Sequence, residues 1–310
     1  MTPLGVLDAA LVGALVLVAA VAVLVPRRAA ATSAFLIFGI LLAVMWGRID
    51  APDVAMAEAA LGGGVAGALL TDALERRLPP RPARERRTPL ILLSSLVGAV
   101  VLAALVVVMR QLPAAPAELG PIALDAVDRS GVTHPITAVL LNYRSLDTLL
   151  EIAVVVIAAY GAGAVARERV RPLPPAEPVR RTLAVLLLPV LLVLAGWLLV
   201  AGTTQPGGAF QSGAILGAAL VIAHLCGIPY TTPRGRAGAV IIGVGVLAFI
   251  VLGAIGLATS GTWLQLDPAW AGAAILTIEA VLAVSIGVAL AMIFLAAGAR
   301  DTQPRSEGAA

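Results

Sequence analysis

The sequence contains no lysine, a single cysteine and few aromatic residues, and each shortage narrows what the chain can be. Only 13% of its 310 residues are charged and 4% are aromatic, whereas 60% are hydrophobic. Soluble domains carry about 25% charged residues, so the composition excludes an ordinary soluble domain. With Cys226 alone, no disulfide can form within the chain, and its place in an apolar run favours a small buried side chain.

The patterns that mark soluble enzymes and nucleic-acid-binding proteins are also missing. The sequence has no cysteine–histidine metal set, no glycine loop that would hold phosphate after a strand, and no nucleophile paired with a base. We therefore expect no enzymatic activity, no cofactor and no structural metal. The small net charge of +3 does not indicate nucleic acid as a partner.

Long apolar runs are what the sequence has in abundance. A bilayer is crossed by about 20 apolar residues in a helix, and nine runs approach or exceed that length. The predicted fold class is therefore an all-α, polytopic membrane protein with about nine transmembrane helices. The nine runs are 4–25, 30–48, 52–73, 90–112, 137–165, 182–201, 208–228, 238–258 and 271–298.

The positions of the arginines predict the orientation. All but four of them lie in alternate connections between the apolar runs, and cytoplasmic loops are the ones enriched in arginine. This predicts an N-terminus outside and a C-terminus in the cytoplasm. Two of the basic loops, 74–89 and 167–181, are also rich in proline, and we take the second as a domain boundary. The four exceptions are Arg48, Arg110, Arg129 and Arg144.

Residues 142–152 place three charges at the start of an apolar run. At ~100° per residue, Arg144, Asp147 and Glu151 would share one face of a helix. A charge at bilayer depth costs about 2.5–3.5 kcal/mol, so this face is expected to meet protein or a wet cavity. Two interpretations remain open: an interfacial salt-bridge ladder that orients the helix, and part of an ion path.

Three further acids in or near predicted spans are candidates for the ion path. Asp53 follows Pro52 in the first turn of its segment, where the helix dipole favours an anion, although an ion-path role is also open. Glu58 lies deeper, so it should take up a proton or bind a cation or an arginine, which makes it the first-choice functional carboxylate. The glycines after Glu58 allow close helix packing or local unwinding. Glu279 is also deep in its segment.

An uncharged, glycine-rich connection lies between the sixth and seventh apolar runs. Residues 202–213 read GTTQPGGAFQSG, and Pro206, Gly207 and Gly208 are the candidates for a break in the helix. This stretch is either a re-entrant element, which needs protein or water around it, or a tight outside turn.

Three stretches resemble parts of known membrane complexes. Residues 51–64 (APDVAMAEAALGGG) resemble the MbhD family of membrane-bound hydrogenases, which also forms the C-terminal part of the large A subunit of Mrp-type cation/proton antiporters. Residues 136–161 look like the MbhE family that follows it there. Residues 181–228, centred on GTTQPGGAFQSG, resemble the MnhB/MrpB family of the same antiporters.

The chain departs from these families at a few motif positions. Ala57 stands where the first motif usually has threonine, and Thr203 stands where the MrpB family has histidine. Ala209 and Ser212 each replace a glycine of the MrpB-type turn. At position 57 the hydroxyl of the usual threonine, which can help to hold a cation, is therefore missing.

The resemblance implies a fusion of an Mrp A-subunit tail with an MrpB-type part. By this resemblance residues 1–112 are D-like, 113–170 E-like and 171–300 B-like, with 301–310 a disordered cytoplasmic tail. The chain would be a multi-pass component of a Na⁺/H⁺ antiporter in a bacterial inner membrane, bound to other antiporter subunits, including large ones similar to complex I.

The same resemblance implies which residues meet the ions. Glu58 and Asp53 match motif acids suspected of lining a Na⁺ or proton path and of binding Na⁺ transiently. Arg144, Asp147 and Glu151 match the MbhE-type signature. The alternative is a structural membrane-arm subunit of a membrane-bound hydrogenase or related respiratory complex, in which the acids would serve assembly.

Overall fold

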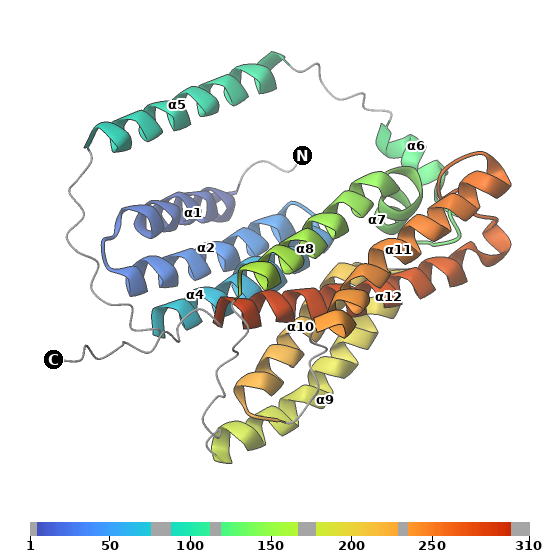
Figure 1. The fold of residues 1–310 in the computed structure, drawn as a ribbon. Helices are drawn as coiled ribbons and strands as arrows, with labels where there is room; N and C mark the ends of the chain where they lie inside the picture. Colours follow the sequence, from blue (N-terminus) through green and yellow to red (C-terminus); the bar gives the residue numbers. More distant parts are fainter. Residues whose placement is uncertain (1–4, 76–87, 112–118, 167–177, 229–234, 299–310) are drawn as a thin grey trace. The chain divides into compact units, whose positions relative to one another are not determined.

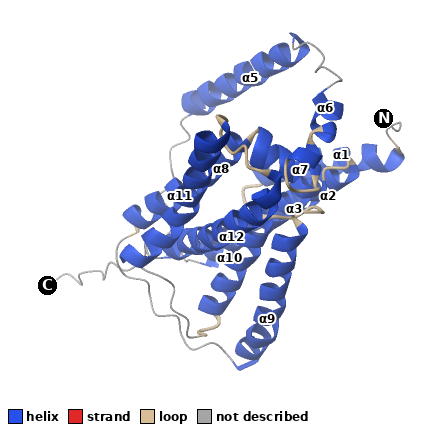
Figure 2. Ribbon diagram, turned by 90° about the vertical axis from the view of Figure 1, so that its right-hand side faces the viewer, coloured by secondary structure: helices blue, strands red, loops and turns tan. Residues whose placement is uncertain are grey.

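The computed structural model describes residues 5–75, 88–111, 119–166, 178–228 and 235–298 (Figure 1). Within these ranges every regular element is a helix, with no strand (Figure 2). Seven of these helices are long and apolar enough to cross a membrane, which confirms an all-α, polytopic membrane protein.

Two shorter apolar helices, Leu96–Gln111 and Ala209–Leu225, occupy the remaining two predicted runs. The count of nine transmembrane helices and the orientation of the termini therefore stay predictions. The tail 301–310 and most of the basic loops 74–89 and 167–181 lie outside the described residues.

The chain divides into two compact units, residues 75–126 and the remainder. The smaller unit contains α5 (Thr88–Gln111) and α6 (Leu119–Asp125). From Leu96 onward the described side chains of α5 are exposed, although most of them are apolar. Such a surface suits lipid or a partner helix rather than water.

The larger unit begins with a helical hairpin of α1 (Val6–Leu24) and α2 (Arg28–Arg48). The guanidinium of Arg48 donates to both oxygens of Asp8, with Nε–Oδ1 at 2.9 Å and Nη2–Oδ2 at 3.2 Å. Paired hydrogen bonds of this kind fix both position and orientation, so they join the start of α1 to the end of α2.

The next predicted span is interrupted by a π-helix. It consists of α3 (Pro52–Glu58), the π-helical η1 (Ala59–Val65) and α4 (Ala66–Glu75). A Cβ on Gly39 of α2 would lie 3.2 Å from the carbonyl carbon of Gly62, so the two backbones pack closely. The glycines after Glu58 thus provide both the close packing and the local change of helix type.

A second π-helix precedes α8. The short α7 (Pro135–Ala138) continues into the π-helical η3 (Val139–Tyr143), and α8 runs over Ser145–Val165. Between them Arg144 has φ −126° and ψ 32°, which is not helical. The predicted run 137–165 is therefore not one continuous helix, and Arg144 lies at its break.

The last four helices form a group that is centred on α12. They are α9 (Pro178–Ala201), α10 (Ala209–Leu225), α11 (Gly235–Ser260) and α12 (Pro268–Gly298). More than half of the apolar stretch of α12 is buried (56%), against 28% or less in each of the other six candidate spans. Its main partners are α10, α11 and α8. The buried residues of α12 recur at helical spacing and include Ala271, Ile275, Ile278, Leu282, Ile286 and Ala289.

Glycines bring α10 and α12 close together. A Cβ on Gly213 would lie 2.9 Å from the Ile286 side chain, and one on Gly287 would lie 3.0 Å from the Gly213 carbonyl oxygen. Small residues that let backbones approach are a common means of packing helices in membranes. This crossing positions the start of α10 against the middle of α12.

We expect Gly287→Val to destabilise the fold by about 1–3 kcal/mol, because the added methyl groups would force the two backbones apart. Thermal unfolding of the purified chain in detergent measures this. Gly161→Val on α8 is the matched control, because no atom beyond the nearby backbone of its own helix and its two chain neighbours lies within 4 Å of the position of its Cβ. Equal melting temperatures for the two variants would contradict the close crossing.

Candidate functional site

A pocket of about 660 Å³ lies among α3, α8, α10 and α12, and the segment that leads into α8. Most of its lining is apolar, but Asp53, Glu151 and Glu279 each contribute a carboxylate from a different helix. Gly207 of the turn between α9 and α10 also lines it. The pocket therefore collects acids that are up to 226 positions apart in the sequence, between residues 53 and 279.

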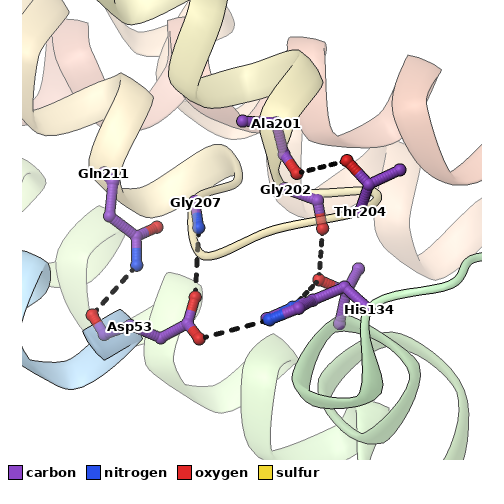
Figure 3. A network of polar contacts seen from close by, with 8 residues as sticks. Asp53, His134, Ala201, Gly202, Thr204, Gly207 and Gln211 are labelled. Carbon is purple, nitrogen blue, oxygen red and sulfur yellow. Dashed lines mark hydrogen bonds and ion pairs between the residues drawn. The ribbon is translucent and has the colours of Figure 1, made fainter. Parts of the chain in front are cut away.

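Asp53 connects α3 to the glycine-rich turn. Its Oδ1 accepts a hydrogen bond from the Gly207 amide at 3.1 Å, and its backbone carbonyl accepts one from Gln211 Nε2 at 3.2 Å (Figure 3). The first bond satisfies a backbone amide of the turn, and an unpaired one would be costly in an apolar environment. Asp53 therefore does more than interact with the dipole of its own helix.

The turn itself is shorter than the predicted stretch 202–213. Helix α9 ends at Ala201 and α10 begins at Ala209, so the turn comprises 202–208. Gly208 has φ +117°, and a Cβ there would lie 2.7 Å from Glu279 Oε1, so this position favours glycine on both counts. Pro206 and Gly207 precede it and lie within the break between the two helices. Whether the turn is re-entrant stays a prediction.

Glu279 is the most deeply buried acid of the pocket, with 4% of its surface exposed. Its Oε1 accepts a hydrogen bond of 3.3 Å from the Ala209 amide at the start of α10. Its Oε2 is buried and has no hydrogen-bond partner in the described part of the chain. A buried carboxylate oxygen without a partner needs a proton or a cation, so this oxygen is a candidate binding atom.

The 142–152 signature is divided by the structure. Glu151 lines the pocket and is exposed, whereas Asp147 and Arg144 are not part of the lining. Arg144 Nη2 and Asp147 Oδ2 form an ion pair of 2.5 Å, with side chains 70% and 47% exposed. Arg144 and Asp147 thus match the salt-bridge interpretation, whereas Glu151 is placed to act in the pocket.

Glu58 is half-buried at the end of α3 and does not line the pocket. Its carboxylate lies against Gly62, where any larger residue would occupy the same space. The π-helix η1 begins directly after it, and such distortions are frequent at functional sites. The ion-path role of Glu58 stays a prediction.

Two residues that the sequence did not single out complete the site. His134 Nε2 lies 3.7 Å from Asp53 Oδ2, and His134 Nδ1 lies 3.2 Å from the Thr137 hydroxyl. The local signal was a histidine directly before Pro135, at the start of the segment that leads into the 142–152 signature. Its proximity to Asp53, 81 positions earlier, is visible only in the structure.

Two family models match parts of this chain, and each matched part contains residues of the site. The MbhD family model, which describes the D subunit of MBH, matches residues 13–79. The model of a domain related to the MnhB subunit of Na⁺/H⁺ antiporters matches residues 179–302. The chain therefore combines an MbhD-type region with a region related to MnhB. Asp53 lies in the D-type region, while Gly207 and Glu279 lie in the B-type region.

Two solved structures share the fold of this chain. A chain of the Mrp complex from Dietzia sp. DQ12-45-1b aligns with a TM-score of 0.74 and 24% identity, over 98% of this chain and 36% of that one. A chain of the membrane-bound sulfane sulfur reductase, an archaeal respiratory membrane complex, aligns with a TM-score of 0.53 and 25% identity. That alignment covers 65% of this chain and 95% of the other. No curated protein matches.

The chain thus spans about a third of the Dietzia chain that it resembles. The resemblance of residues 51–64 to the MbhD family and of residues 181–228 to the MnhB/MrpB family is confirmed. The domain boundaries, including the E-like segment 113–170, stay predictions.

We expect Glu279→Gln to unfold at the same temperature as the native chain or at a higher one. An amide keeps the acceptor for the Ala209 amide and removes the need to neutralise a buried charge. Glu279→Ala should instead lose about 1–3 kcal/mol, because that amide then has no acceptor. Thermal unfolding in detergent compares the two. If Glu279→Gln is as unstable as Glu279→Ala, the charge itself is needed for the fold.

Proposed function

We propose that this chain is an integral subunit of a multisubunit monovalent cation/proton antiporter. Its role is to contribute carboxylates to an ion path and to bind the larger subunits that complete the exchanger. The larger of its two matched regions, residues 179–302, is related to the MnhB subunit of Na⁺/H⁺ antiporters, which supports this assignment. Transport, not catalysis, is the activity proposed.

The observation that carries the proposal is the meeting of Asp53, Glu151 and Glu279 at one apolar pocket. Carboxylates in such surroundings bind either a proton or a cation, because the bare charge is poorly solvated there. Each ion can then displace the other at the same oxygens. Competition of this kind is the minimum chemistry that an antiporter requires.

The other predicted residues extend this path. Glu58 follows Asp53 by just over one helical turn and would bind the ion next, with Na⁺ held transiently by these two acids. The exposed pair of Arg144 and Asp147 lies at the start of α8, the helix that also carries Glu151. We place this pair at the entrance of the path or at a contact with a neighbouring subunit.

The proposed setting is a bacterial inner membrane, with other antiporter subunits as partners, among them large ones similar to those of complex I. The Dietzia chain that shares this fold belongs to an Mrp complex, which supports this setting. The hydrogenase-type alternative is not favoured, because the antiporter-related region is the larger of the two family matches.

The ion-path proposal is tested with Asp53→Asn, Glu279→Gln and Glu58→Gln in the complete complex. Each variant should abolish the Na⁺-driven change of pH in everted membrane vesicles, because an amide can neither release a proton nor neutralise a cation. Fluorescence of a ΔpH-sensitive dye measures the exchange.

Asp267→Asn is the matched control, because Asp267 is an exposed acid that lies outside the pocket and caps α12 through the Ala269 amide. Asparagine retains that cap, so exchange should be unchanged. Normal exchange in both Asp53→Asn and Glu279→Gln would remove the pocket from the path, and normal exchange in Glu58→Gln would remove Glu58.

The partner proposal predicts what accompanies the tagged chain when it is purified from its native membrane in mild detergent. Large complex-I-like subunits and small antiporter subunits should be recovered, without subunits that carry metal clusters. Mass spectrometry of the purified complex identifies them. Recovery of cluster-bearing hydrogenase subunits would favour the respiratory alternative, and recovery of the chain alone would contradict both.

A further inference from the structure

His134 joins Asp53 to the backbone of the glycine-rich turn through a short chain of polar contacts (Figure 3). Its Nε2 lies 3.7 Å from Asp53 Oδ2, and its Nδ1 lies 3.2 Å from Thr137 Oγ1. The Thr137 hydroxyl in turn donates to the Gly202 carbonyl oxygen at 2.5 Å. The side chains of His134 and Asp53 are only 12% and 13% exposed, so this network is largely shielded from solvent.

The direction of these bonds follows from counting hydrogens. A threonine hydroxyl has a single hydrogen, and a backbone carbonyl can only accept. Because the Thr137 hydroxyl donates to Gly202, its contact with His134 must be one in which it accepts. His134 Nδ1 therefore carries a hydrogen. Rotating the ring by 180° would place carbons against both Thr137 and Asp53, so the observed orientation is the one that uses both nitrogens.

The second nitrogen then determines the state of the pair. With Nδ1 protonated, a neutral His134 would present a lone pair at Nε2 to the Asp53 carboxylate. Two acceptors that face each other repel, and Asp53 Oδ2 is buried with no hydrogen-bond partner among the described residues. One hydrogen between Nε2 and Oδ2 removes the conflict. The pair is either imidazolium with carboxylate or imidazole with carboxylic acid.

The charges around the pair support this shared hydrogen. Asp53 Oδ1 faces the neutral Gly207 amide, and the other acids of the adjacent pocket are Glu151 and Glu279. No arginine is among the described residues that line the pocket, and the sequence has no lysine. His134, which lies beside Asp53, is therefore the basic side chain that contacts an acid of this pocket among the described residues.

We propose that Asp53 and His134 form a proton-holding pair, in which one proton resides on His134 Nε2 or Asp53 Oδ2 and Thr137 is the positioning residue. When the Nε2–H bond breaks and the Oδ2–H bond forms, imidazolium becomes neutral imidazole and carboxylate becomes neutral acid. The net charge of the pair does not change. Since 3.7 Å exceeds a direct hydrogen bond, transfer follows a small approach of the two side chains or passes through one water molecule.

This pair deepens the proposed antiport function, on which its role in exchange rests. A monovalent cation that enters the pocket and binds the Asp53 carboxylate places a second positive charge beside the pair. The pair then releases its proton, leaving neutral His134 and a cation-bound carboxylate. One positive charge replaces another at Asp53, which is the elementary event of cation/proton exchange.

Nuclear magnetic resonance of isotope-labelled histidine in the full chain, reconstituted in lipid nanodiscs, tests the pair. The chain has only two histidines, His134 and His224, so the difference from a His134→Gln spectrum assigns the signal. We expect Nδ1 of His134 to carry a hydrogen in both forms of the pair. A neutral His134 with its hydrogen on Nε2 and a bare Nδ1 would overturn the proposal.

Thr137 variants test the positioning role. Thr137→Val has the same shape without an acceptor, so the Nε2–H form should appear, whereas Thr137→Ser should restore the native spectrum. A purely structural role of Thr137 would not change which nitrogen carries the hydrogen. If Thr137→Val gives the same spectrum as the native chain, the positioning role is therefore overturned.

Sodium addition separates this proposal from the proposed function. NaCl, but not choline chloride, should convert imidazolium to neutral Nδ1–H imidazole, and an unchanged spectrum would overturn the coupling to the cation. These spectra need no transport. If the spectrum is the predicted one but the complex does not exchange ions, the antiporter function alone is contradicted. If the complex exchanges ions but His134 Nδ1 carries no hydrogen, the proton-holding pair alone is overturned.

Discussion

The hydrogen bond from the Gly207 amide to Asp53 joins the two family-matched regions of this protein. Asp53 belongs to the D-type region and Gly207 to the B-type region, 154 positions later. In an apolar environment a free backbone amide is costly, so the turn between α9 and α10 needs an acceptor of this kind. The Gln211 side chain donates to the backbone of the same aspartate. The site therefore exists only where the two regions meet.

Close helix packing places the other wall of the site. The glycines of α10 and α12 allow their backbones to approach, and Gly208 leaves the space that the Glu279 carboxylate occupies. As a result the deeply buried Glu279 of α12 lies against the start of α10. Its Oε2 has no hydrogen-bond partner among the residues that the structure describes. Buried polar groups without partners reduce stability, and their presence in a well-packed core is a sign of function.

The candidate site was partly predictable. Asp53, Glu151, Glu279 and Gly207 stood out because charged residues and paired glycines are unusual inside apolar runs, and all four line the same pocket. His134 did not stand out, because it lies at the edge of a connection, where a polar residue is ordinary. Arg144 and Asp147 pair with each other at the break before α8, since the helix there begins only at Ser145.

The sequence by itself determined the class of the protein, because the length and apolarity of a segment are local properties and decide whether it can cross a bilayer. It also determined the two family regions, whose motifs are contiguous. Only the tertiary structure decided which acids meet, since the helices that carry residues 53, 151 and 279 are brought together by packing. Side-chain contacts over such separations leave no periodic pattern in the chain, so their partners emerge only when the helices are in place.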